Sequence, residues 1–323
     1  MTATLYVSPG GDGWRNLAIE EYLMDRVGPD DAVVYFFINS QAVVIGRNQN
    51  PWAECRLAQM DADGVQLVRR ITGGGAVYHD RGNLNFSFIM GKNRYDRKRQ
   101  TEMILDAVRG MGISCEATGR NDLLADGRKF SGNAYCERGH ARLHHGTLLV
   151  SADLERLQNY LNVDAGKLAA KGIRSVRSRV CNLSEFRPGI QVVDVLERVI
   201  AACRSGFDGC RELPAGEIGG ADLERIVEKH ASEEWRLGKT PRFDYAISAR
   251  FPWGGVQLLL RLSGGAVEDL DAFTDADDPT LADEIRRRLR GARFGSATMA
   301  RALREGGGAQ IDELADYIVS MGF

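Results

Sequence analysis

The chain has 323 residues, of which 44% are hydrophobic and 27% are charged, so it can bury a core of normal size for a globular protein. Its formal net charge of −2 offers no overall attraction for nucleic acid or for an anionic membrane. No apolar run approaches the roughly 18 residues that cross a bilayer, and the first residues lack the pattern of a signal peptide. We therefore expect neither nucleic acid nor a membrane as a partner.

The cysteines indicate a reducing compartment. Six are scattered along the chain without any CxxC spacing, and in a chain of this length that pattern is typical of reduced thiols rather than of a disulfide framework. The tightest pair, Cys203 and Cys210, is weak evidence for a metal site. We expect a cytoplasmic protein and favour a monomer.

Hydrophobic periodicity predicts alternating strands and helices in the first 160 residues. The segments 33–38 and 42–45 are rich in β-branched and aromatic residues and are predicted to form a pair of buried strands. Pro51 is placed to begin a helix that runs to about residue 62. Further strands are predicted at residues 5–7, 65–70, 85–88, 113–117 and 143–150, and further helices at 16–27, 97–110 and 152–161.

A hairpin is predicted around Asp126 and Gly127, because an Asp-Gly pair between two extended runs is a strong short-range turn signal. The turn places Lys129 just past it, with Phe130 on the opposite face of the strand. A lysine after a turn is most often simply solvated. The alternative is a point charge that holds a carboxylate or phosphate.

The rest of the chain divides into two parts. Helices are predicted at 190–203 and 221–231, with a glycine-rich loop or linker at 204–220 between them. Residues 235–245 form a plausible boundary, which gives domains 1–242 and 243–323. The second domain has two strands joined by a Ser-Gly-Gly turn and then helices, which predicts a compact α+β module. Its strands are predicted at 256–262 and 267–273, and its helices at 281–289 and 311–321.

The most unusual stretch is residues 69–83, RRITGGGAVYHDRGN, in which three consecutive glycines follow two arginines. Ordering three glycines is costly, and between strands the gain is close approach of the backbone to a ligand, with N–H groups free for an anion. Arg69 and Arg70 add positive charge suited to phosphate or carboxylate. We favour a ligand cradle over a simple bulge. The sequence contains neither a P-loop nor a GxGxxG fingerprint.

Two further features leave alternatives open. His144 and His145 alternate in direction on a strand, so only one of them can face a site, and with His140 they form an incomplete ligand set for a metal. The basic stretch 167–182, KLAAKGIRSVRSRVCN, is either a solvated loop or a ligand-binding loop. RNA binding is disfavoured there because no aromatic residues are interleaved.

Five motifs in order and spacing resemble the lipoate–protein ligase A family. They are RRITGGGAVYHDRGN, GRNDLL, RKFSGNAY, HHGTLLV and KLAAKGIRSVRSRVCNL. The resemblance covers roughly residues 3–290 and fades in 204–220 and near the C-terminus. It implies a biotin/lipoate ligase-like α/β (α+β) fold, a mixed sheet flanked by helices, with a second, small α+β accessory domain.

The reaction implied by this resemblance has two steps. Lipoate and MgATP give lipoyl-AMP, and the lysine of a carrier domain then takes the lipoyl group. The implied carriers are apo lipoyl domains of 2-oxoacid dehydrogenase complexes and the glycine-cleavage carrier protein. Lys129 is implied to be catalytic, and Asp122 to hold Mg²⁺. The implied lipoate-binding residues are Arg70, Gly73, Gly74, Gly75, Ala76, His79, His145 and Gly146, and the implied ATP- or adenylate-binding residues are Asn121, Asp122, Lys129, Lys171, Gly172, Ile173, Ser175, Val176 and Arg177.

Two other functions stay open at this point. An ATP-independent octanoyl or lipoyl transferase would carry the acyl group on a cysteine, and the candidate is Cys136, seven residues after Lys129. A noncatalytic lipoate-binding protein would keep the same pocket. The sequence does not decide between lipoate and octanoate, because two sulfurs change little in a slot for an apolar tail.

Overall fold

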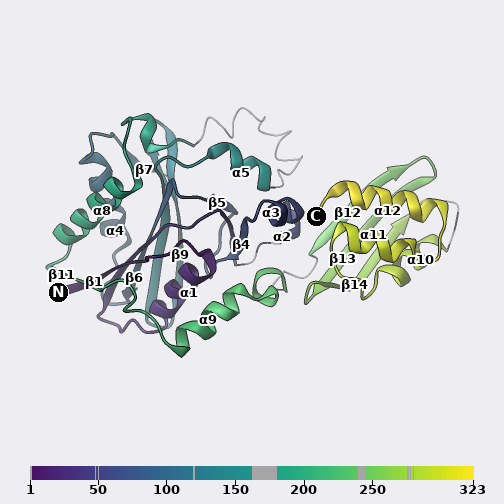
Figure 1. Cartoon of the computed structure of the whole chain (residues 1–323), viewed down its shortest axis with the longest axis horizontal. Coiled ribbons are helices and arrows are strands. Elements are labelled where there is room, and N and C mark those ends of the chain that lie inside the picture. Colours follow the sequence, from purple (N-terminus) through teal and green to yellow (C-terminus); the bar gives the residue numbers. More distant parts are fainter. Residues whose placement is uncertain are drawn as a thin grey trace.

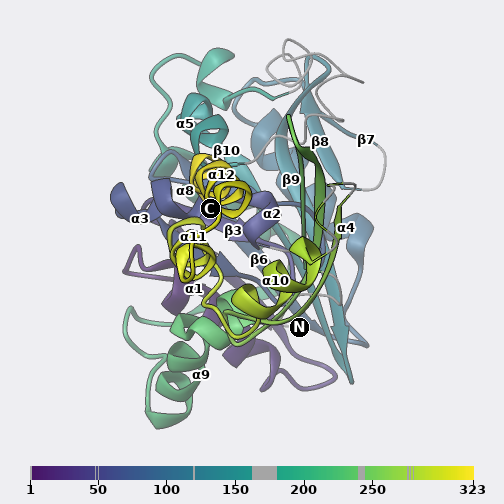
Figure 2. The same ribbon diagram turned by 90° about the vertical axis from the view of Figure 1, so that its right-hand side faces the viewer.

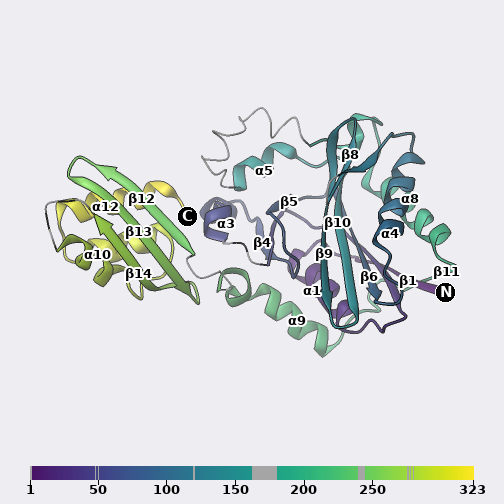
Figure 3. The same cartoon turned by 180° about the vertical axis from the view of Figure 1, so that it is seen from behind.

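The computed structural model describes residues 2–47, 49, 51–118, 121–161, 180–238, 244–274, 276, 278 and 280–323. Its larger part is built on a mixed sheet with the strand order β11-β1-β2-β6-β10-β9-β8-β7 (Figures 1 and 3). Strands β11, β1 and β2 run parallel to one another, and the other neighbours are antiparallel. The strands are β1 (Thr2–Val7), β2 (Ala32–Phe37), β6 (Asn83–Gly91), β7 (Glu116–Thr118), β8 (Asp122–Ala125), β9 (Arg128–Arg138), β10 (Ala141–Leu149) and β11 (Gly209–Glu212).

Helices cover both faces of this sheet, so β6 at its centre is buried at every residue. Val34 and Phe36 of β2 pack on the side of α4 (Arg97–Arg109) and α8 (Val192–Gly206). Tyr35 and Phe37 point the other way, toward α1 (Gly13–Met24) and α9 (Ala221–Ala231). This period-two alternation gives the large sheet one hydrophobic core on each of its faces. Shorter elements are α2 (Pro51–Glu54), α3 (Leu57–Ala62), α5 (Leu154–Tyr160), η1 (Leu183–Glu185) and η2 (Glu234–Gly238).

A second, small sheet lies beside the large one and has the order β4-β3-β5. Its strands are β3 (Ala42–Ile45), β4 (Gln66–Arg69) and β5 (Val77–His79). The two buried strands predicted at 33–38 and 42–45 are therefore present as β2 and β3, but they belong to different sheets. Strand β2 already bonds to β1 on one side and β6 on the other, which leaves no edge for β3.

Most predicted elements are present, with three corrections. The hairpin at Asp126 and Gly127 is confirmed, with φ of 50° and 69°, the positive values that a type I′ turn requires. The predicted helix 51–62 is split, because Cys55 bridges to Leu161 and the Arg56 amide bonds the Tyr160 carbonyl. The predicted loop 204–220 contains β11, and no strand was predicted over residues 77–79.

The small C-terminal domain is an antiparallel sheet covered on one face by helices (Figures 1–3). The predicted glycine turn is confirmed, since Gly264 and Gly265 have φ of 57° and 80°. The prediction missed β12 and α11. The elements are β12 (Tyr245–Phe251), β13 (Gly254–Ser263), β14 (Ala266–Thr274), α10 (Leu281–Leu289), α11 (Ser296–Arg304) and α12 (Ala309–Met321).

The two parts touch through an aromatic contact and an ion pair. Trp52 meets Phe294 edge-on at 4.5 Å between ring centroids, and Arg293 pairs with Glu233 at 2.8 Å. The C-terminal Phe323 stacks on Phe294 at this junction. Among the residues that the structure describes, we find no helix with the length and apolar character needed to cross a membrane.

Candidate active site

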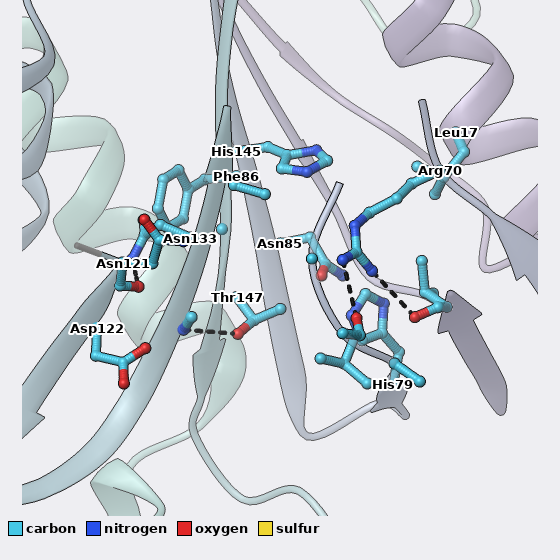
Figure 4. Close-up of a pocket in the computed structure, with 18 of the residues that line it drawn as sticks. Leu17, Arg70, His79, Asn85, Phe86, Asn121, Asp122, Asn133, His145 and Thr147 are labelled. Carbon is cyan, nitrogen blue, oxygen red and sulfur yellow. Dashed lines mark hydrogen bonds between the residues drawn. The ribbon is translucent and has the colours of Figure 1, made fainter. Parts of the chain in front are cut away.

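A cavity of about 290 Å³ lies between the large and the small sheet (Figure 4). We call it the acyl pocket, after the ligand that the resemblance of the motifs implies. It brings together residues from α1, β2, β3, β5, β6, β8, β9 and β10 with the triple-glycine loop. Ten of the predicted site residues line it, although up to 76 positions separate them in the sequence: Arg70, Gly74, Gly75, Ala76, His79, Asn121, Asp122, Lys129, His145 and Gly146.

Other residues of the lining were not predicted. One group is apolar and comprises Leu17, Phe37, Val44, Val77 and Phe86. Their sequence signal, hydrophobic residues in strands and a helix, is the same as that of any core residue, so only the fold distinguishes them. The polar additions are Asn85, Asn133 and Thr147. Gly73 is outside the lining, and the predicted Lys171, Gly172, Ile173, Ser175, Val176 and Arg177 lie outside the described residues.

The triple-glycine loop is wrapped around the guanidinium of Arg70. Arg70 Nη2 donates to the carbonyls of Gly73 and Gly75 at 2.7 and 2.8 Å, and Arg70 Nε donates to Thr72 Oγ1 at 3.0 Å. Nη1 donates to the Val44 carbonyl at 3.1 Å. Since arginine has five N–H donors, at most one is left for a ligand. Arg70 is 7% exposed, and burial lowers its pKa to about 10.

Two close approaches explain glycine at fixed positions of the site. A Cβ on Gly46 would lie 2.2 Å from the Gly74 carbonyl oxygen, so the loop can pack here only against a glycine. A Cβ on Gly146 would lie 2.6 Å from Phe86 Cζ and 2.7 Å from Asn133 Oδ1. Gly146 therefore lets both side chains reach the pocket wall.

Lys129 is aimed into the pocket by a β-bulge. The register between β8 and β9 shifts, so that Leu123 faces Ser131 while Leu124 faces Lys129. A bulge turns a strand locally, and here Lys129 and Gly132 both reach the pocket lining. Lys129 Nζ pairs with Asp122 Oδ1 at 2.7 Å. As predicted, Phe130 points the other way and is fully buried.

The described chain resumes beside Lys129 after residues 162–179. Val180 forms a parallel bridge with Lys129, and the Cys181 amide donates to the Lys129 carbonyl at 2.9 Å. The end of the basic stretch is thus fixed to the backbone of the lysine that the sequence singles out.

Of the two adjacent histidines, His145 lines the pocket, and both of its ring nitrogens are engaged. Nδ1 contacts Glu20 Oε1 at 2.7 Å and Nε2 contacts Thr72 Oγ1 at 2.8 Å. The Thr72 hydroxyl also accepts from Arg70 Nε, so it contacts both side chains. His145 therefore joins helix α1 to the glycine loop. His144 is buried against Gln100 and Asn133, and burial lowers its pKa to about 3.

Arg69 does not enter the pocket, contrary to the expectation of an anion-binding charge. It is fully buried and donates to backbone carbonyls of two distant segments. One segment is the loop of Gly46, Arg47 and Gln49, and the other is Trp235 and Arg236 in η2. Burial lowers its pKa to about 10. The arginine joins three pieces of backbone instead of binding a ligand.

Cys136 is unsuited to act as a nucleophile. It is outside the pocket lining, and burial raises the pKa of its thiol. All six cysteines are free. Within the described residues no group of three or more histidine, cysteine or acidic side chains is close enough to hold a metal ion. Asp122, the first residue of β8, contributes a carboxylate to the pocket lining.

Comparison with known proteins agrees with this geometry. The model of the lipoyl protein ligase A/B catalytic domain matches residues 12–204, and that of the bacterial lipoate protein ligase C-terminus matches residues 240–318. The chain belongs to the lipoate–protein ligase family. The resemblance predicted from the five motifs is confirmed.

Solved structures of lipoate–protein ligases share the fold. The chain is 25% identical to P. falciparum LipL1, solved with lipoate, with a TM-score of 0.64 over 98% of this chain and 99% of that one. It is 26% identical to the bipartite ligase of Thermoplasma acidophilum, solved in a study of that ligase and its E2 lipoyl domain, with a TM-score of 0.65 over 75% and 98%. A lipoate–protein ligase A bound with ATP is 26% identical, with a TM-score of 0.64 over 74% and 100%. The predicted biotin/lipoate ligase-like fold with a small C-terminal domain is confirmed.

Proposed function

We propose that this ligase activates lipoate with ATP to form lipoyl-AMP and then transfers the lipoyl group to a lysine of a carrier domain. The observation that carries the proposal is the acyl pocket itself. It combines an apolar interior with a lysine aimed into it from a bulged strand. The related structures with lipoate and with ATP support the choice of both substrates.

Lys129 is placed to reduce the repulsion between the carboxylate of lipoate and the α-phosphate of ATP. In the first step a carboxylate oxygen attacks the α-phosphorus, and the bond to the β-phosphate breaks to release pyrophosphate. Two like unit charges at about 4 Å repel by roughly 4 kcal/mol at an effective dielectric of about 20. A cation between them offsets that repulsion and holds the two groups in line. Lys129 would exchange its ion pair with Asp122 for these contacts.

Asp122 fits a role with the magnesium that accompanies ATP. Mg²⁺ is usually held by one or two carboxylates together with substrate phosphates and water, so a single carboxylate beside the nucleotide suffices. Asp122 and Asn121 lie at one end of the pocket and offer oxygen donors there (Figure 4). The ion would neutralise phosphate charge, while Lys129 orients the acyl carboxylate.

The second step needs a neutral lysine amine from the carrier. It attacks the carbonyl carbon of lipoyl-AMP, the bond to the phosphate oxygen breaks, and the amine loses a proton as AMP leaves. We infer that residues 171–177 belong to the adenylate-binding loop, because the described chain resumes at Val180 beside Lys129. Lipoyl domains of 2-oxoacid dehydrogenase complexes are proposed carriers, supported by the archaeal ligase studied with its E2 lipoyl domain. The glycine-cleavage carrier protein is proposed on the family resemblance. The domain division at 242/243 is part of the same proposal.

The deciding experiment is AMP release that requires ATP, lipoate and an apo lipoyl domain together. Lys129→Ala should abolish ATP–pyrophosphate exchange while weakening lipoate binding only in part. Lys98→Ala is the matched control, since Lys98 is an exposed lysine of α4 outside the acyl pocket. Full exchange by the Lys129 variant would remove that residue from the reaction. ATP-independent acyl transfer by the wild type would contradict the whole proposal.

A further inference from the structure

One ring nitrogen in the acyl pocket lacks a hydrogen-bond partner. His79 ends strand β5, is 4% exposed and lines the pocket, yet its Nε2 is buried without a partner. No other described residue of this pocket has a buried side-chain nitrogen or oxygen in that condition. A buried polar group without a partner is costly, so its presence calls for a ligand atom or another reason.

The hydrogen bonds behind His79 decide whether this nitrogen donates or accepts. Asn16 Nδ2 donates to the Gly10 carbonyl at 3.1 Å, and a carbonyl can only accept, which fixes the orientation of that amide. The same Nδ2 donates to Asn39 Oδ1 at 2.9 Å. The other end of the Asn39 amide, Nδ2, is therefore the donor that faces His79 Nδ1 at 3.1 Å. His79 Nδ1 must accept, so the ring proton is on Nε2.

The ring carries that single proton at physiological pH. Burial, together with the smaller effects of the nearby Arg70 guanidinium and His145, lowers the pKa of His79 to about 3. A neutral ring with its proton on Nε2 presents a donor without a charge. Such a donor is better suited to a weak, uncharged acceptor than to a carboxylate, which Lys129 serves elsewhere in the pocket.

His79 lies at the end of the pocket away from the nucleotide residues. Figure 4 shows Asn121 and Asp122 at one side of the pocket and His79 at the other. A carboxylate held at Lys129 therefore sends its tail toward the apolar lining and His79. Whether the His79 Nε2–H finds a hydrogen-bond acceptor therefore depends on the atoms that the tail places there.

We propose that His79 is a specificity-determining residue, whose Nε2–H donates to a sulfur of a 1,2-dithiolane tail and so selects it over an all-carbon tail of similar shape. This inference rests on the proposed function and deepens it. Sulfur is a weak acceptor, but an all-carbon tail offers none and leaves the N–H unpaired. Shape alone discriminates little between the two tails. A polar group of the site that one tail leaves without a partner discriminates much more strongly.

The probe for this proposal is a pair of acids that differ only in the ring atoms. Lipoate has a dithiolane ring on a pentanoate chain, and 5-cyclopentylpentanoate has a carbocycle on the same chain. Calorimetric titration of the full-length protein without ATP or carrier measures their binding alone. We expect lipoate to bind roughly ten-fold more tightly, as one donor left unpaired implies.

Two variants at one position separate the donor from the shape of the ring. His79→Phe removes both nitrogens and should abolish the preference between the two acids, whereas His79→Gln keeps an N–H donor and should retain part of it. The control is His140→Phe, because His140 lies outside the acyl pocket, where its Nε2 meets the Val27 carbonyl. A loss of stability common to the variants would lower both affinities without changing their ratio.

Nitrogen-15 NMR of the wild type tests the proposal without any variant. The ring shifts should report a neutral His79 protonated at Nε2, and lipoate, but not the cyclopentyl acid, should shift the Nε2 resonance. A proton on Nδ1, or equal affinity for both acids with ATP-dependent ligation intact, would overturn the role of His79 alone. If neither acid bound, the proposed function would fail and this inference with it.

Discussion

Replacing Gly46 by alanine tests whether the glycine loop must be held in one place. Gly46 is not in the pocket lining and does not have a positive φ, so the change adds no backbone strain of its own. The new Cβ would lie 2.2 Å from the Gly74 oxygen, and real Cβ contacts are essentially never shorter than 3.0 Å. The loop must therefore move by about 0.8 Å or more.

The expected cost follows from the kind of contact. Overpacking usually costs about 1–3 kcal/mol, and no rotamer change relieves a clash with backbone, so we expect the upper end of that range. For a domain of about 150–250 residues this lowers Tm by roughly 2–4 °C per kcal/mol, or roughly 6–12 °C in all. A displacement of about 1 Å at a reaction site can slow the reaction on the order of 100-fold, and we expect a comparable loss of ligation rate.

Thermal denaturation and AMP release measure the two effects. Gly219→Ala is the control, because a Cβ there meets nothing within 4 Å and the residue also lacks a positive φ. If Gly46→Ala matched this control in both Tm and ligation rate, the contact between Gly46 and Gly74 would not position the loop, and the reasoning would be refuted.

Three other substitutions have distinct expected outcomes. Cys136→Ser should leave ligation intact, and its complete loss in a ligation assay would favour the transferase mechanism instead. Gly132→Ala should slow pyrophosphate exchange with little change in Tm, since a Cβ there would lie 3.0 Å from Lys129 Cε and Nζ and would displace that flexible side chain; unchanged exchange would mean that the lysine adapts. Glu21 is buried, which raises its pKa, but hydrogen bonds from His230 and Lys229 outweigh burial and lower it from 4.5 to about 2. Its stabilisation of about 3 kcal/mol is complete above about pH 4.5 and is lost as pH falls toward 2. In Glu21→Gln the free energy of urea unfolding should therefore change less with pH over that interval than in the wild type. Parallel plots of that free energy against pH for the two proteins would contradict this.

Local chemistry was sufficient to predict much of the fold. The turn at Asp126 and Gly127 was predictable because its signal lies within a few residues, and strand β6 because apolar and polar residues alternate over 85–88. By contrast, β5 has three residues and β11 lies in a glycine-rich stretch. Both are strands because a partner edge elsewhere in the chain binds them, and no short sequence window contains that edge.

The site shows the same division. Ten pocket residues were predictable because they occur in motifs, whereas the role of a side chain depended on partners far away in sequence. Arg69 and Arg70 look alike in sequence, yet one holds η2 and the other the glycine loop. Likewise, His79 and His145 are both pocket histidines, and their partners distinguish them, Asn39 for His79 and Glu20 with Thr72 for His145. The direction of each hydrogen bond depends on neighbours that are distant in sequence, so no periodic sequence pattern reports it.

The burial of Arg69 also decides where the catalytic part can be separated from the rest of the chain. Helix α9 ends at Ala231, which looks like a natural stopping point for a shortened protein. Ending there would strip the arginine of its carbonyl partners at Trp235 and Arg236 and leave a buried cation partly unsatisfied. Shortened versions that stop after Gly238 keep η2 and should be recovered folded, so expression of a minimal enzyme depends on seven residues that contain no pocket group.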